Sequence, residues 1–191
     1  GKYKAPLDEY DVPETLIFQA AEKTDTAIFV IGRNSGGEEC DRHLPEDYYL
    51  TRSEESLLKD ICTHFANVVI VLNVNGLIDL SWVKKYASIK SLLFIGIPGE
   101  EGASALAGIL TGEINPSGKL AVTIAEHYED YPSADHFSWD KEHLENILDY
   151  ESYGLSSEEN GSTGFTKSPV TVYWEDIYTG YRYFDTFGKQ V

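Results

Sequence analysis

Three short, uninterrupted apolar runs constrain the fold of this chain more than any other feature. The runs are rich in β-branched side chains, and stretches with helical periodicity separate them. A strand that is apolar at successive positions is buried on both faces, as in a parallel sheet that helices cover. The runs occupy residues 26–32, 68–74 and 91–97. We therefore expect three neighbouring strands of a parallel sheet.

The stretches beside these runs predict helices at 13–23, 51–65, 80–86 and 102–110. Thr51 and Glu54 have the spacing of a capping box, and an apolar stripe follows them. The last stretch is rich in Ala and Gly, so we expect its nearly bare surface to pack closely against the sheet. Residues 119–125 add a fourth predicted strand. This alternation predicts an α/β sandwich, a mostly parallel sheet with helices on both faces.

The order of the segments indicates a single α/β-sandwich domain over residues 1–191 with two additions. Residues 126–169 form a predicted acidic, loop-rich insertion. Residues 170–187 form a predicted aromatic, β-rich tail. Its aromatic residues occur at both odd and even positions, so both faces of a strand would be apolar. We expect this tail to pack as an added strand or an extended arm. In the alternative interpretation, Trp174 and Tyr178 line a binding site.

Charge and composition exclude several classes of function. Fifteen Lys and Arg face 32 Asp and Glu, which gives a net charge of −17. Such a chain repels phosphate backbones and anionic membranes, so we expect neither a nucleic-acid nor a membrane partner. No apolar run approaches the ~20 residues of a membrane-spanning helix, and no signal peptide is visible. The chain begins at Gly1 and has no Met, so we expect a piece of a longer protein, and the sequence indicates no localisation.

Candidate chemistry concentrates in the loop at 33–43, because open α/β sheets bind ligands at the carboxyl ends of their strands. The glycines of this loop match neither the G-x-G-x-x-G pattern nor the P-loop, so we do not expect a phosphate-binding loop. Cys40, Asp41 and His43 lack the spacing of a structural zinc site, so we expect no metal, and nothing indicates a cofactor. The sequence has no G-x-S-x-G motif, the turn that carries the nucleophilic Ser of α/β-hydrolases, so we do not expect a hydrolase triad. A Gly-rich turn in which Asp41 and Arg42 pair with each other or with neighbours is the structural alternative.

The chain has two cysteines, which is too few for a disulfide framework. Cys40 lies in the polar loop. Cys62 falls within an apolar helical pattern, and we expect it to be buried there.

Several motifs occur in a fixed order along the chain. Asn-Pro-Ser-Gly-Lys-Leu at 115–120 and Gly-Tyr-Arg-Tyr-Phe at 180–184 are specific in combination. Ile-Gly-Arg-Asn-Ser-Gly ends the first apolar run, and Pro-Gly-Glu-Glu-Gly stands at 98–102. Together these motifs resemble glycoside hydrolase family 3, in particular its second, α/β-sandwich domain. Asp176 stands where the family pattern has Gly, and Glu100 where Gln is common.

The resemblance implies part of a retaining, exo-acting β-glycosidase of the β-glucosidase type, with a β-linked sugar as substrate. Retention needs two carboxyl groups ~5–5.5 Å apart. In this family the nucleophilic Asp belongs to a separate barrel domain of the same protein, so we expect the isolated chain to be inactive. In many members of the family the sandwich domain supplies the acid/base Glu, and the resemblance implies the same role here. Alignment on the loop residues Asp41 and Arg42 makes Glu38 that candidate, and Glu39 competes because this loop is one residue longer than the family pattern.

Two other hypotheses stay open at this point. One is a non-catalytic carbohydrate-binding or structural module of a glycosidase, in which Glu38 has lost its role. The other is a flavodoxin-like nucleotide binder, which the absent phosphate loop and the negative charge disfavour. A barrel domain with an Asp at a strand end, in the same protein, would separate the first two hypotheses.

Overall fold

The computed structural model describes residues 10–33, 47–134 and 175–191. The chain divides into two compact units, Gly1–Glu126 and His127–Val191. The first unit holds the sheet, and the second holds the aromatic tail. In the described parts of the chain, no helix is long and apolar enough to cross a membrane.

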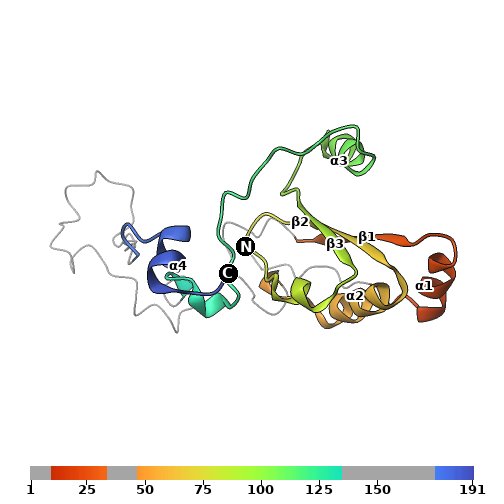
Figure 1. Ribbon diagram of the computed structural model, residues 1–191, viewed down its shortest axis with the longest axis horizontal. Coiled ribbons are helices and arrows are strands. Elements are labelled where there is room, and N and C mark those ends of the chain that lie inside the picture. Colours follow the sequence, from red (N-terminus) through yellow and green to blue (C-terminus); the bar gives the residue numbers. More distant parts are fainter. Residues whose placement is uncertain (1–9, 34–46, 135–174) are drawn as a thin grey trace, which may run out of the picture. The chain divides into compact units, whose positions relative to one another are not determined.

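The first unit is built on three parallel strands, β1 (Thr26–Gly32), β2 (Asn67–Asn73) and β3 (Ile89–Phe94) (Figure 1). Their order in the sheet is β1-β2-β3, so β2 is central. All three apolar runs form strands, which confirms the α/β class and the parallel sheet. β3 begins two residues before the predicted range of 91–97 and stops three residues before that range ends, and Gly96, which lies beyond it, has a left-handed φ of 62°.

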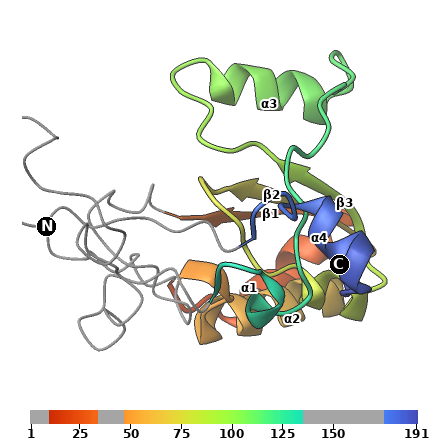
Figure 2. The same cartoon turned by 90° about the vertical axis from the view of Figure 1, so that its left-hand side faces the viewer.

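Helices and an apolar core cover one face of this sheet. α1 (Glu14–Ala21) and α2 (Arg52–His64) lie along that face (Figure 2), and η2 (Ser81–Lys85) joins the same core. The helix predicted at 80–86 is thus a short 3₁₀ helix. The core contains Ile17, Phe29, Ile31, Leu50, Leu58, Phe65, Val68, Ile70, Leu72, Val74, Ile78 and Trp82. These residues come from β1, β2, α1, α2, η2 and the adjoining loops, so this face is where burial stabilises the unit.

The N-terminus of α2 has the predicted capping box. The Thr51 hydroxyl accepts the Glu54 N–H at 3.2 Å, and the Glu54 carboxylate accepts the Thr51 N–H at 2.8 Å. This pair satisfies two backbone donors that a helix start otherwise leaves unpaired. The prediction from the spacing of these residues is confirmed.

The opposite face of the sheet is only partly covered. Ile28 and Val30 of β1 are 53% and 50% exposed, whereas Val71 of β2 is fully buried. The predicted burial on both faces is therefore right for β2 and wrong for β1 and for β3, which has no fully buried residue. The physical reason is position, because β1 lies at the edge of the described sheet and has a neighbour on one side only.

α3 (Gly102–Leu110) forms where the Ala- and Gly-rich stretch predicts it, but its side chains are mostly exposed. A Cβ at Gly102 would lie 2.4 Å from the Pro98 ring, and one at Gly108 would lie 2.8 Å from Ile114. The glycines of α3 therefore leave room for Pro98 and Ile114, which belong to the loops on either side of the helix. The predicted close packing of this helix against the sheet is not what the structure shows.

The fourth strand predicted at 119–125 is absent from the described part of the chain. Leu120 and Val122 are 57% and 47% exposed, while Ala125 is buried. The segment alternates as a strand would, but it has no ladder of hydrogen bonds to a neighbouring strand. Alternation without a pairing partner does not make a strand.

The second unit joins η3 (Tyr128–Asp130) to α4 (Tyr181–Phe187). The rings of Tyr131 and Phe184 meet edge to face, with centroids 5.8 Å apart. The Lys189 Nζ donates to the Asp130 carboxylate at 2.7 Å, and this hydrogen bond raises the pKa of Lys189. These contacts hold segments that lie far apart in the sequence.

The tail is helical where the sequence predicts a strand. Residues 181–187 form α4, with Gly180 before it and Gly188 after it, both at positive φ. The β-rich interpretation is therefore wrong for this part of the tail. Tyr178 packs edge to face on Phe187, with ring centroids 5.3 Å apart, and remains 39% exposed. Residues 135–174, including Trp174, lie outside the described residues.

Asp176 adopts a left-handed backbone conformation, with φ at 48°. Glycine adopts this conformation freely, and Asp tolerates it better than β-branched residues do. The backbone geometry accounts for the Gly of the family pattern at this position and for its replacement here by Asp.

Cys62 lies on α2, partly buried against the core. Burial raises the pKa of its thiol, and the Ser88 side chain opposes this in part. In a Cys40→Ser background we expect iodoacetamide to modify Cys62 at least several-fold more slowly in the native protein than in urea, because the thiolate is the reactive form. Mass spectrometry over time at pH 8 measures both rates.

The raised pKa of the Cys62 thiol also makes the free energy of unfolding depend on pH. The unfolded thiol ionises first, near its ordinary pKa of about 8.5. The free energy of unfolding should therefore fall as the pH rises above that value, and Cys62→Ala should remove this contribution. Equal modification rates in buffer and in urea would contradict the assigned burial.

Candidate functional site

The candidate loop begins at the carboxyl end of β1. Four of its residues were singled out by the sequence, namely Glu38, Glu39, Asp41 and Arg42, and all four lie outside the described residues. The structure does describe both flanks of the segment 34–46 that carries them. On one side stands Arg33, directly after β1, and on the other side the chain returns at Asp47.

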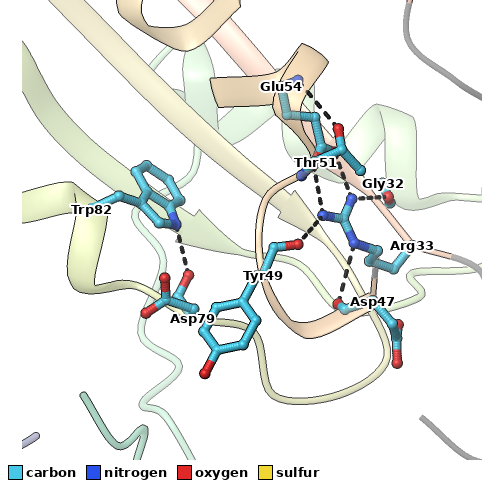
Figure 3. Close-up of polar contacts among 8 residues, drawn as sticks. All are labelled: Gly32, Arg33, Asp47, Tyr49, Thr51, Glu54, Asp79 and Trp82. Carbon is cyan, nitrogen blue, oxygen red and sulfur yellow. Dashed lines mark hydrogen bonds and ion pairs between the residues drawn. The ribbon is translucent and has the colours of Figure 1, made fainter. Parts of the chain in front are cut away.

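Arg33 binds both flanks at once (Figure 3). Its Nε donates to the Asp47 carbonyl at 3.2 Å, and its Nη2 donates to the Tyr49 carbonyl at 3.2 Å. Its Nη1 donates to the Gly32 carbonyl at 2.8 Å. Two further bonds, from Nη1 and Nη2, reach the two oxygens of Glu54 at 2.6 and 2.8 Å. Every N–H of the guanidinium group is used, and the group is fixed in orientation.

The ion pair between Arg33 and Glu54 is buried. The two side chains are 3% and 4% exposed, so little water competes with the bonds between them. The bidentate geometry matches the planar guanidinium to both carboxylate oxygens. Because the same Glu54 carboxylate accepts the Thr51 N–H, the pair is also tied to the first turn of α2. The loop flanks, β1 and α2 thus meet at one ion pair.

Sequence reasoning assigned Glu54 only to the capping box and did not find its bond to Arg33. The two residues are 21 positions apart and belong to different elements. A Glu at this helical position is usually exposed, and no periodicity separates a buried one from an exposed one. The pairing became visible only from the arrangement of β1 beside α2.

The ends of β1 and β2 are joined by further bonds. The Arg33 N–H donates to the Asn73 carbonyl at 3.1 Å, which extends the β1–β2 ladder by one residue. The Asp79 N–H donates to the Tyr48 carbonyl at 2.9 Å. Tyr48 is fully buried, and its hydroxyl donates to the Ala125 carbonyl at 3.4 Å. The return of the candidate loop is therefore attached to the loop that follows β2.

Asp79 organises that second loop. Its carboxylate accepts the Ser81 N–H at 2.9 Å and the Ser81 hydroxyl at 3.0 Å. Its carbonyl accepts the Trp82 indole N–H at 2.7 Å (Figure 3). Both Asp79 and Trp82 are buried. These bonds fix the start of η2, and they use the Asp79 carboxylate for structure.

The polar side chains described at this edge therefore hold the loop backbones in place. Among them, no buried side-chain nitrogen or oxygen lacks a hydrogen-bond partner. Within the same described residues, no group of three or more His, Cys, Asp or Glu is placed to hold a metal ion. What the arrangement can do is hold the two flanks of a Gly-rich, acidic segment at the carboxyl edge of a parallel sheet. This edge is where such sheets bind ligands.

Comparison with known proteins agrees with this architecture. The family model described as "Glycosyl hydrolase family 3 C-terminal domain" matches residues 14–181. Beta-glucosidase A of Butyrivibrio fibrisolvens is 34% identical, over 94% of this chain and 21% of that protein. A beta-glucosidase of Ruminococcus albus is also 34% identical, over 95% of this chain and 16% of that protein. The chain thus spans about a fifth of the length of these relatives.

A solved structure shows the same fold. Beta-glucosidase 3B from Thermotoga neapolitana, determined in complex with glucose, is similar with a TM-score of 0.76 and 32% identity. The similarity covers 98% of this chain and 23% of that one. Together with the family model, this likeness agrees with the resemblance that the sequence motifs indicate. The chain belongs to the C-terminal domain family of the family 3 glycosyl hydrolases.

Proposed function

We propose that this chain is the acid/base-supplying domain of a retaining, exo-acting β-glucosidase whose nucleophile lies in a separate barrel domain. The observation that carries the proposal is the anchoring, through Arg33, of the two flanks of segment 34–46 at the carboxyl edge of the sheet. That segment contains Glu38 and Glu39. The relatives named beta-glucosidase support the substrate class.

In the proposed reaction, hydrolysis of a β-glucoside with retention, this domain supplies one of the two carboxyl groups. A retaining glycosidase protonates the leaving oxygen with one carboxylic acid and forms a glycosyl–enzyme ester with another carboxylate. Water then cleaves the ester, and the first group takes the proton from that water. Glu38 is the proposed acid/base, and Glu39 is the competitor. One of the two serves as the acid/base, and the nucleophile lies in the barrel domain.

The test uses the full-length protein with Glu38→Ala and, separately, Glu39→Ala. For the acid/base residue we expect kcat/KM on phenyl β-glucoside, a poor leaving group, to fall by about 10²–10⁴-fold. The loss on dinitrophenyl β-glucoside should be far smaller, because that leaving group departs without a proton. Added azide should restore turnover of the activated substrate and yield β-glucosyl azide, since azide needs no general base.

The control is Glu55→Ala, which removes an exposed Glu of α2. It should leave both rates near those of the unchanged protein. The same profile in Glu39→Ala, and not in Glu38→Ala, would move the role by one residue. Near-normal activity in both variants would overturn the proposal and favour the non-catalytic module. The 191-residue chain alone should not hydrolyse either glucoside, since it lacks the proposed nucleophile.

A further inference from the structure

We propose that Arg33 and Glu54 act as positioning residues for the acid/base group of the segment they flank. The inference rests on the proposed function and extends it to residues outside segment 34–46. It concerns the buried ion pair of Arg33 and Glu54, to which neither the family motif nor the capping-box spacing assigns a part in catalysis.

The first step is the attachment of both flanks to a single rigid group. Arg33 leaves β1 with its N–H bound to the Asn73 carbonyl, so its backbone is held by the sheet. Its side chain then holds the carbonyls of Asp47 and Tyr49 at 3.2 Å each, where the chain returns. One planar guanidinium group therefore fixes the separation of the two flanks and their orientation.

The second step is the rigidity of that group. Glu54 holds the guanidinium from the far side with bonds of 2.6 and 2.8 Å, and both side chains are nearly inaccessible to water. Glu54 is itself held by the Thr51 N–H at the start of α2. The ion pair thus attaches the two flanks to strand β1 and to helix α2. Strands and helices position functional groups better than free loops do.

The third step links this anchoring to rate. Fixing the two ends of any stretch of chain reduces the conformations that the residues between them can adopt. A displacement of about 1 Å of a reacting group can cost about 10²-fold in rate. Arg33 does not touch the reacting atoms in this proposal, because all of its N–H groups are already used. It acts through the acid that the segment carries.

The test exploits the difference between Arg and Lys. Lys keeps the positive charge but has three donors on one nitrogen, so it cannot reproduce the fork to Glu54 and the bonds to three carbonyls. In the full-length protein, Arg33→Lys should lower kcat/KM for phenyl β-glucoside by about 10–10²-fold. The value for dinitrophenyl β-glucoside should fall much less, and azide should accelerate its turnover.

The ratio of the two kcat/KM values is the decisive readout. Partial unfolding lowers both values in proportion, because both depend on the same concentration of folded enzyme, and so it leaves the ratio unchanged. Glu54→Gln should change the ratio in the same direction as Arg33→Lys. The matched controls are Arg52→Lys and Glu55→Gln, which alter exposed residues of α2 and should leave the ratio as it is.

Two results would overturn the inference, and they are distinguishable. If Glu38→Ala or Glu39→Ala changes the ratio while Arg33→Lys leaves it constant, the ion pair is structural only and the proposed function stands. If neither Glu variant changes the ratio, the proposed function fails, and the positioning role fails with it. A changed ratio in both Arg33→Lys and one Glu variant supports the inference.

Discussion

Glu54→Ala is expected to lower the free energy of unfolding by about 3–5 kcal/mol, because it leaves the buried guanidinium of Arg33 without its counter-charge. The variant also removes the acceptor for the Thr51 N–H at the start of α2. Urea-induced unfolding of the 191-residue chain, followed by circular dichroism in the far ultraviolet, measures the loss. The expected result is a lower midpoint with an unchanged slope.

Glu55→Ala is the matched control for this prediction. Glu55 is the next residue of the same helix and is exposed, so its replacement should change stability by no more than about 0.5 kcal/mol. A loss below about 1 kcal/mol for Glu54→Ala would contradict the buried ion pair. Losses of that size are typical of ion pairs at the surface.

A double variant separates the pair from its surroundings. Arg33→Met combined with Glu54→Leu removes both charges, so it should cost less than the sum of the single variants. It should still destabilise the protein, because the carbonyls of Gly32, Asp47 and Tyr49 lose their shared donor. An unsatisfied buried acceptor costs about 1–3 kcal/mol. An exactly additive result would mean that the two side chains do not interact.

The features that were predicted correctly are local ones. A capping box depends on residues three apart, and a buried strand is a single run of apolar side chains. Both signals are complete within a short window, which is why α2 and the central strand β2 were predictable. The family motifs are likewise short, and the resemblance they carry agrees with the family model.

The features that were missed depend on what lies beside a segment. Leu120 and Val122 alternate as in a strand, but only a neighbouring strand could complete a ladder. The bond from Arg33 to Glu54 joins two elements whose contact no local pattern encodes. Pairing between distant segments is a property of the folded chain, and a single sequence does not display it.

The tail is a different case, because a signal for the helix was present. Tyr181, Phe184 and Phe187 recur every third residue, as on one face of a helix. Gly188 stands directly after them in the left-handed conformation that often ends helices. The high content of aromatic residues favours a strand by propensity, and this weak preference outweighed a spacing that was the better guide.

The half-covered sheet leads to the second large effect, a comparison within one strand. Ile31 and Ile28 both belong to β1 and point to opposite faces. Ile31 is fully buried in the core, and Ile28 is 53% exposed. Ile31→Ala should lower the free energy of unfolding by about 2–5 kcal/mol, through lost burial and the cavity left behind.

Ile28→Ala changes the same residue type in the same strand, so backbone preference contributes equally to both variants. That preference spans only about 1 kcal/mol between residue types, and Ile28 has little buried surface to lose. We therefore expect Ile28→Ala to cost about 1 kcal/mol or less, measured by the same urea titration. Equal losses at the two positions would mean that both faces of β1 are packed in solution, as the apolar run alone predicts. A large loss confined to Ile31 would show that a strand apolar at successive positions can still have one face open.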